Sequence, residues 1–177
     1  MAKFVIVSLV AGGLLCSCSP ESPVSADLIS QNDFESLSGW VAAVPPGLTT
    51  ERAHSGSYAV KVDAATEFGA GYTTTLADAK LQPGQKLQVS AWALRTSGET
   101  NAALVVQLLD PATGQQLDWH GLSLVEQIKT YNRWMLIEMQ VRIPDNAPPH
   151  SLLKVYPWRY QAVQAAYFDD IQLRRKN

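Results

Sequence analysis

Short alternating runs of apolar and polar residues dominate the sequence from residue 31 onward, and helical periodicity is nearly absent. The clearest runs are 86–95 and 133–143, and Gly, Pro, Asn and Asp separate them from their neighbours. Alternation with a period of two gives a strand one buried face, and many such runs between turns are typical of a β-sandwich. The sequence therefore predicts an all-β fold, a jelly-roll β-sandwich of two antiparallel sheets with about nine or ten strands. In the second run, the residues expected to face the core are Met135, Ile137, Met139, Val141 and Ile143.

The last predicted strand, 167–173, carries an acidic residue on the face that is expected to be buried. Ile171 and Leu173 alternate with polar residues, and Asp169 falls on the same face as they do. A carboxylate out of water is costly unless it is paired or coordinates a metal. The strand itself contains no Lys or Arg. Asp169 therefore needs a partner from elsewhere in the chain.

Glu35 is the candidate partner, in the first strand-like segment, 31–35. Two carboxylates at opposite ends of a sequence can be neighbours only if the first and last strands meet, and like charges that close need a cation between them. We therefore expect the two ends to close the sandwich, with Glu35 and Asp169 sharing a structural Ca²⁺. The alternative is that both carboxylates are exposed, or accept hydrogen bonds from backbone amides at the sheet ends.

The N-terminus has the features of an export signal. An apolar run of about a dozen residues, 4–15, follows a short basic start and is too short to span a bilayer. The next residues, Leu15-Cys16-Ser17-Cys18, resemble the bacterial lipoprotein cleavage box, with a small residue directly before Cys18. We predict a lipoprotein signal peptide over 1–17 and lipidation of Cys18. Cleavage by an ordinary signal peptidase, with two incidental cysteines, is the alternative.

The remaining sequence divides into a short linker and one domain. Residues 18–30 are rich in Ser and Pro and are expected to form a tether, and 31–177 is long enough for a single domain. Acyl chains on Cys18 would anchor the protein without a transmembrane helix. We therefore expect an exported monomer in the cell envelope, in the outer membrane or at the cell surface, whose lipid is its only contact with the membrane.

The composition argues against nucleic-acid binding and against catalysis. Removal of Lys3 with the signal leaves 13 of the 14 basic residues against 16 acidic ones, a net charge of −3. A nucleic-acid partner would need a basic face, so we expect none. The three histidines, His54, His120 and His150, lack the spacing of a zinc site, and the sequence has no nucleophile elbow or phosphate-binding loop. We expect that the protein is not an enzyme.

Five segments occur in an order and at a spacing that match a known pattern. They are Asn32-Asp33-Phe34-Glu35 with Gly39-Trp40, then 53–62, then 81–92, then Trp134, and finally 167–171. Together they resemble carbohydrate-binding modules of the family 4, 9 and 22 group, which belong to the galactose-binding-domain-like jelly rolls. The resemblance runs from about residue 31 to residue 173, nearly the whole predicted domain.

The resemblance implies two sites. One is a structural calcium site with Glu35 and Asp169 as side-chain ligands, and with backbone carbonyls near Gln31 and in the loop 54–56 completing the oxygen shell. Ca²⁺ takes about six to eight oxygen ligands and accepts backbone carbonyls. The other is a glycan site in which aromatic rings stack on sugars, either on a concave sheet face or at a loop edge.

Aromatic residues are the natural candidates for the glycan site, because a sugar ring combines an apolar C–H face with hydroxyl edges. Trp119 and the segment 158–160 are expected in loops, where core packing does not explain an aromatic residue. Trp92 lies on a mixed strand face. Burial in the core is the alternative for each residue, and Trp40 and Trp134 are expected to be structural. The predicted ligand-binding residues are Tyr72, Trp92, Trp119, Trp158 and Tyr160.

We therefore expect a non-catalytic carbohydrate-binding lipoprotein that holds a polysaccharide or oligosaccharide near the cell surface. An alternative is a structural or protein-interaction domain of the envelope that keeps the same fold without a glycan ligand. An enzyme is the third and weakest hypothesis.

Overall fold

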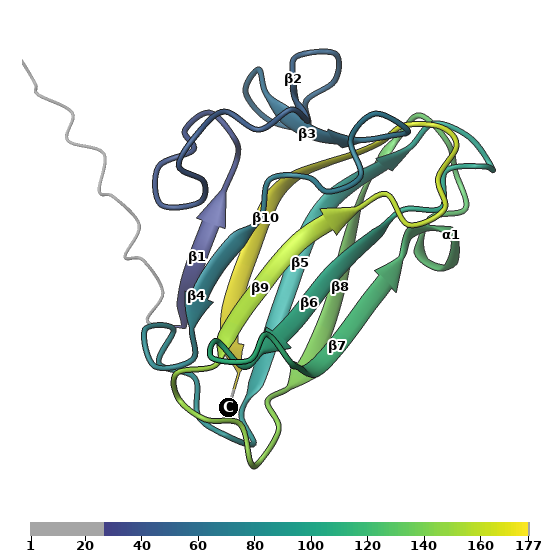
Figure 1. The fold of residues 1–177 in the computed structure, drawn as a ribbon. Coiled ribbons are helices and arrows are strands. Elements are labelled where there is room, and N and C mark those ends of the chain that lie inside the picture. Colours follow the sequence, from purple (N-terminus) through teal and green to yellow (C-terminus); the bar gives the residue numbers. More distant parts are fainter. Residues whose placement is uncertain (1–26, 177) are drawn as a thin grey trace, which may run out of the picture.

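Ten β-strands and one helical turn make up residues 27–176, the part of the chain that a computed structural model describes. The predicted signal peptide at 1–17, the lipidation site Cys18 and the first part of the predicted tether, 18–26, lie outside the described residues. The strands form two antiparallel sheets that face each other as two layers (Figure 1). The predicted all-β sandwich of two antiparallel sheets is therefore confirmed.

The larger sheet contains both ends of the described chain. Its strand order is β2-β3-β10-β5-β8, and β1 also pairs with β10. The bounds are β1 (Leu28–Asn32), β2 (Leu48–Thr49), β3 (Ala59–Val62), β5 (Lys86–Arg95), β8 (Trp134–Arg142) and β10 (Ala166–Lys176).

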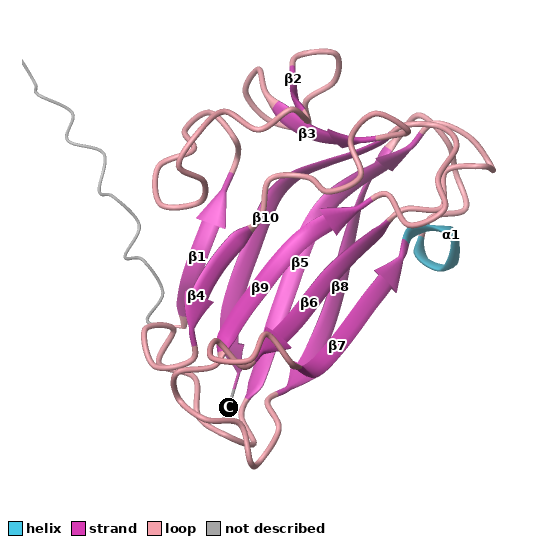
Figure 2. Cartoon of the chain, in the orientation of Figure 1, coloured by secondary structure: helices cyan, strands magenta, loops and turns pink. Residues whose placement is uncertain are grey.

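The smaller sheet has the order β4-β9-β6-β7. Its strands are β4 (Tyr72–Thr75), β6 (Ala103–Leu109), β7 (Gln116–Ser123) and β9 (Leu152–Trp158). The one helical element of residues 27–176, α1 (Leu124–Gln127), follows β7 at the sheet edge (Figure 2). Within the same residues, no helix has the length and apolar character that a membrane span requires.

The core lies between the two sheets, and the alternation in the sequence places most of its residues correctly. In β5, Leu87, Val89, Ala91 and Ala93 are buried. In β8, Ile137 and Val141 face the core as predicted, and so does Ile143 just after the strand. Met135 does not, since 37% of it is exposed. Because β8 is the edge strand of its sheet, this side chain has a neighbouring strand on one side only.

Strand β10 joins the two ends of the domain, as the sequence predicts. It pairs with β1 and β3 along one edge and with β5 along the other. The pairing with β1 runs from Leu28 with Arg174 to Asn32 with Ile171. The sheet thus begins at Leu28, so the last residues of the predicted tether, 28–30, are part of the folded domain.

A β-bulge in β10 changes which residues face the core. Asp169 pairs with Trp92, but Gln172 pairs with Ser90, so three steps on β10 match two on β5. Asp170, inside this bulge, has a φ of +47°. The extra residue reverses the alternation. Phe168 and Ile171 both belong to the core, and Asp169 faces the outer side of the sheet with Trp92. The prediction that Asp169 shares the core face of Ile171 and Leu173 is therefore wrong.

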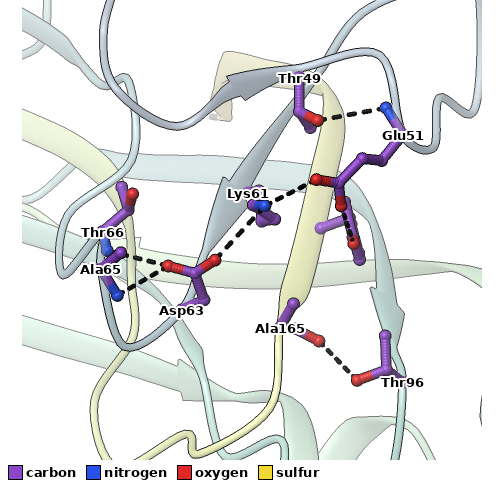
Figure 3. Close-up of polar contacts among 9 residues, drawn as sticks. Thr49, Glu51, Lys61, Asp63, Ala65, Thr66, Thr96 and Ala165 are labelled. Atoms are coloured by element: carbon purple, nitrogen blue, oxygen red, sulfur yellow. Dashed lines mark hydrogen bonds and ion pairs between the residues drawn. The ribbon is translucent and has the colours of Figure 1, made fainter.

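The segment between β2 and β3 is held against the outer side of the larger sheet by a polar network. Glu51 accepts hydrogen bonds from Lys61 Nζ at 2.8 Å and from the Tyr167 hydroxyl at 2.7 Å. Lys61 also lies 3.4 Å from Asp63 (Figure 3). Because Lys61 and Tyr167 sit opposite each other on β3 and β10, the segment that carries Glu51 is tied to both strands.

We predict that β1 is required for full stability. A chain that starts at residue 27 should melt like the full chain, and a chain that starts at residue 33 should melt lower by roughly 5 °C, because it loses the β10 pairing and the burial of Ile29. Scanning calorimetry of the two truncated chains measures the difference. Equal melting temperatures would show that the domain does not begin with β1.

Candidate functional site

The outer face of the smaller sheet presents a row of large side chains from β9. Leu153 and Val155 point into the core, so Lys154, Tyr156 and Trp158 point outward by alternation. Facing positions on β6 and β7 follow from the pairing register. Each of these β9 residues has a direct neighbour on β6 and, beyond it, one on β7. Next to Trp158 lie Ala103 and then Ser123, and next to Tyr156 lie Val105 and then Gly121. Next to Lys154 lie Gln107 and then Trp119.

Three aromatic rings contact Trp158, and a fourth contacts one of those three. The Phe68 ring lies nearly parallel to the Trp158 ring, with centroids 6.4 Å apart and an interplanar angle of 9°. The rings of Tyr160 and Trp119 meet Trp158 edge-on, at 4.9 Å and 6.2 Å. Tyr156 contacts Phe68 edge-on at 5.8 Å. These residues form a continuous aromatic cluster on the solvent side of the sheet, and Phe68 and Trp119 are 54% and 40% exposed.

Small residues make the floor beside this cluster. Ala103 and Val105 of β6 lie next to Gly121 of β7. A Cβ atom at Gly121 would overlap the indole of Trp119, so the ring lies directly over this glycine. The Trp119 ring can occupy this position only because residue 121 has no side chain.

Polar side chains of β6, β7 and β9 form a hydrogen-bonded chain on the same face, beside the aromatic cluster. The Tyr156 hydroxyl donates to Gln107 Oε1 at 3.3 Å, and Gln107 Nε2 donates to Gln116 Oε1 at 3.2 Å. Burial raises the pKa of Tyr156 above its ordinary value, and a hydrogen bond from Trp119 opposes this shift. The phenol therefore stays neutral at physiological pH, with a proton to donate.

A groove with a volume of about 340 Å³ opens between the aromatic cluster and α1. It lies at one end of the smaller sheet, where β6 begins and where β7 and β9 end. Its lining combines aromatic rings with amide, hydroxyl and carboxylate groups, from Asn101, Ala103, Trp119, Gly121, Ser123, Val125, Glu126, Trp158 and Tyr160. This arrangement offers flat apolar surfaces beside hydrogen-bonding groups, which is what a sugar chain needs.

A second feature lies on the outer side of the larger sheet, where two carboxylates bind one loop. Asp169 accepts hydrogen bonds from the backbone N–H groups of His54 and Ser55, at 2.7 and 3.2 Å. Glu35 accepts them from Ser57 and Tyr58, at 2.6 and 2.8 Å. The first and last strands thus bring both acids to the loop 54–58. Glu35 itself lies three residues after β1 and not within it.

Both carboxylates accept hydrogen bonds from backbone amides, which is the alternative that the sequence analysis sets beside calcium, and Ca²⁺ binding by Glu35 and Asp169 stays a prediction. Asp169 is fully buried, and desolvation raises its pKa to about 6 although the amides of His54 and Ser55 oppose the shift. A cation would remove this cost. Among residues 27–176, no group of three or more His, Cys, Asp or Glu side chains could hold a metal. An ion here would therefore need backbone carbonyls and water as further ligands, which Ca²⁺ accepts.

Residues 26–160 match the model of the family CBM_4_9, described as a carbohydrate binding domain. The chain belongs to this family of carbohydrate-binding domains. The match confirms the resemblance that the five sequence segments carry. Among curated proteins, nothing matches the sequence.

Solved structures of family 22 carbohydrate-binding modules share the fold of this domain. The C-terminal family 22 module of Clostridium thermocellum Xyn10B is 22% identical, with a TM-score of 0.56, over 86% of this chain and 96% of the module. The CBM22-2 xylan-binding domain of Paenibacillus barcinonensis Xyn10C is 17% identical, with a TM-score of 0.57, over 84% of this chain and 99% of that domain. The CBM22-1 and GH10 modules of C. thermocellum Xyn10B, complexed with xylohexaose, are 18% identical, with a TM-score of 0.55, over 85% of this chain and 29% of that one.

The carbohydrate-binding domain brings three of the five predicted ligand residues together. Trp119, Trp158 and Tyr160 all line the groove. Only Tyr160 lies in a loop as predicted, because Trp119 is in β7 and Trp158 is the last residue of β9. Phe68 and Tyr156 complete the cluster and were missed, although the alternation of 152–158 already places Tyr156 on the face of Trp158.

The other two predicted ligand residues lie elsewhere. Tyr72 pairs with inward-facing Val155 and packs against Trp40, with ring centroids 5.4 Å apart. Trp92 is on the outer face of the larger sheet, where the His54 imidazole stacks on it at 3.9 Å and 12°. Trp40 is buried, as expected of a structural residue. Neither Tyr72 nor Trp92 belongs to the groove.

The contact between Glu35 and the loop leads to a prediction about Gly56. This glycine has a φ of +54°, and a Cβ here would overlap the Glu35 carboxylate. Gly56→Ala should therefore destabilise the domain by about 2–4 kcal/mol in urea unfolding. Gly114→Ala is the matched control, because Gly114 has a φ of +70° but no atom near its Cβ position. Equal losses for the two variants would contradict the contact between Glu35 and the loop.

Proposed function

We propose that this protein is a non-catalytic glycan-binding module that holds a polysaccharide or oligosaccharide across the outer face of its smaller sheet. The observation that carries the proposal is the aromatic cluster around Trp158, which lies beside a groove lined by amide and hydroxyl groups. Aromatic side chains exposed together on a strand face have no partner in a core, so a ligand is the natural explanation for them.

The aromatic rings and the polar groups of this face match the two kinds of surface on a sugar chain, its C–H faces and its hydroxyl groups. The rings of Phe68, Trp158 and Trp119 offer faces and edges for the apolar C–H side of successive pyranose units. Asn101 and Ser123 offer an amide and a hydroxyl for the sugar hydroxyls, and they are already joined by a hydrogen bond of 3.2 Å. Two of the family 22 neighbours are described as a xylan-binding domain and as a xylohexaose complex, which supports a linear polysaccharide as the ligand.

The groove has a single carboxylate among its described lining residues, which supports binding without hydrolysis. Most glycoside hydrolases need two carboxyl groups, about 5–10 Å apart, on either side of the scissile bond. Among the described residues that line the groove, Glu126 is the one carboxylate. The Asp118–His120 pair, with a distance of 3.0 Å, points to the opposite face of β7 from Trp119. We therefore propose that the module binds its glycan and leaves it intact.

We also propose a structural role for calcium at Glu35 and Asp169. The ion would neutralise the buried carboxylate of Asp169 and fix the loop 54–58 against β10. This loop packs on the larger sheet through His54 and Trp92, away from the groove. Calcium would therefore act on stability and not on the glycan contacts themselves.

We propose a lipid anchor at Cys18, on the side of the domain that lies away from the groove. Cys18 lies ten positions before the start of β1 at Leu28. Figure 1 shows that β1 begins at the end of the sandwich away from α1 and from the loop after β9. An anchor on that side would leave the groove facing away from the membrane surface. We propose a location in the cell envelope on these grounds.

Substitutions in the aromatic cluster test the glycan site. Trp158→Ala and Trp119→Ala should each weaken the affinity for a soluble xylan by about tenfold or more, because each removes a stacking ring. Trp134→Ala, on the larger sheet, is the matched control and should keep the affinity. Calorimetric titration measures all three. If the wild type binds no polysaccharide of a broad panel, an envelope interaction domain without a glycan ligand becomes the better description.

Chelation tests the calcium site. Addition of EDTA should lower the melting temperature of the wild-type protein, because Asp169 then stays buried without a cation. Glu35→Ala should melt at one temperature with and without EDTA. Unchanged melting of the wild type in EDTA would mean that the carboxylates serve only as acceptors for the amides of the loop.

A further inference from the structure

Lys154 lies in the middle of the sheet face that carries the groove. It points outward from β9, two positions from Tyr156 and four from Trp158. On the neighbouring strands it sits opposite Thr73 of β4 and Gln107 of β6. A strand rises about 3.3 Å per residue, so Lys154 lies about 13 Å along the face from Trp158. A sugar chain that extends from the aromatic cluster along β9 would pass over it.

The ammonium group of Lys154 has no ion-pair or hydrogen-bond partner among the described residues. Its neighbours across the sheet, Thr73 and Gln107, are neutral. Lys61, on the outer face of the other sheet, shows the usual alternative, because it is paired with both Glu51 and Asp63. Lys154 is nevertheless half-buried, so its stem lies along the sheet.

An unpaired cation on a ligand-binding face affects which ligand can cover it. A neutral glycan that passed over Lys154 would remove water from the ammonium group and return only hydroxyl contacts, which is costly for a charge. A glycan with an anionic group at that point would replace the water with a charge-assisted hydrogen bond. The position of Lys154 therefore favours an anionic ligand over a neutral one.

We propose that the module recognises a glycan with an anionic substituent, a uronate carboxylate or a sulfate ester, and that Lys154 binds that substituent. The aromatic cluster then holds the neutral backbone of the same chain. At the other end of the face Glu126 lines the groove, and its negative charge disfavours an anionic group there. The two opposite charges thus fix the direction in which a charged chain lies on the sheet. The inference rests on the proposed glycan site and adds the charge of its ligand.

Three polymers with one backbone test the inference. They are a glucuronoxylan, the same xylan after chemical reduction of its carboxyl groups to alcohols, and a sulfated xylan. The wild-type protein should bind at least one anionic polymer about tenfold more tightly than the reduced one, since a hydrogen bond to a charged group contributes about that factor. Lys154→Met should lose this preference and should bind the reduced polymer at least as tightly as the wild type does, because no buried charge then loses its water. Lys86→Met, an exposed lysine on the larger sheet, is the control and should behave as the wild type does.

The outcomes separate the two proposals. A preference for glucuronoxylan or for sulfated xylan that disappears in Lys154→Met supports the inference and identifies the anion. Equal binding of all three polymers by the wild type, or an unchanged preference in Lys154→Met, overturns the role of Lys154 and leaves the glycan site standing. Failure of the wild type to bind any of the polymers, together with other glycans, would overturn both.

Discussion

The pairing of β10 with strands on both of its edges is the constraint on which the rest of the domain depends. It joins β1 to β5, and the bulge at Asp170 turns Asp169 out of the core to receive the loop 54–58. The segment 50–58 thereby covers part of the outer side of the larger sheet, at β3 and β10, while the outward residues of β8 stay exposed. The aromatic cluster lies on the other sheet, and we therefore propose the smaller sheet as the glycan-binding face.

The open face joins two kinds of chemistry that a sugar chain needs. Aromatic rings cluster where β9 ends, at Trp158, and neutral amide groups follow toward Gln107. Gly121, on the same strand as Trp119, leaves room for the Trp119 indole because it has no side chain. On the proposal that this face binds a glycan by shape and stacking, a local charge such as that of Lys154 would discriminate between chains of similar backbone.

The sequence predicted much of the fold because alternation marks buried strands directly, and the alternating run 86–95 is a strand with those limits. It placed Asp169 on the wrong face, because a bulge is defined only against the partner strand. It missed β7, where polar residues occupy both sides of an edge strand. Tyr72 was misassigned for a related reason, since only the register with β9 shows which face of β4 it occupies.

Chemical-shift mapping would test most directly whether the smaller sheet is the glycan-binding face. A titration of the ¹⁵N-labelled protein with a soluble oligosaccharide that it binds should shift the amide signals of β6, β7 and β9 and the indole signals of Trp119 and Trp158. The amides of β5 and β8 should stay in place. Shifts confined to the larger sheet, around Trp92 and Trp134, would contradict the account.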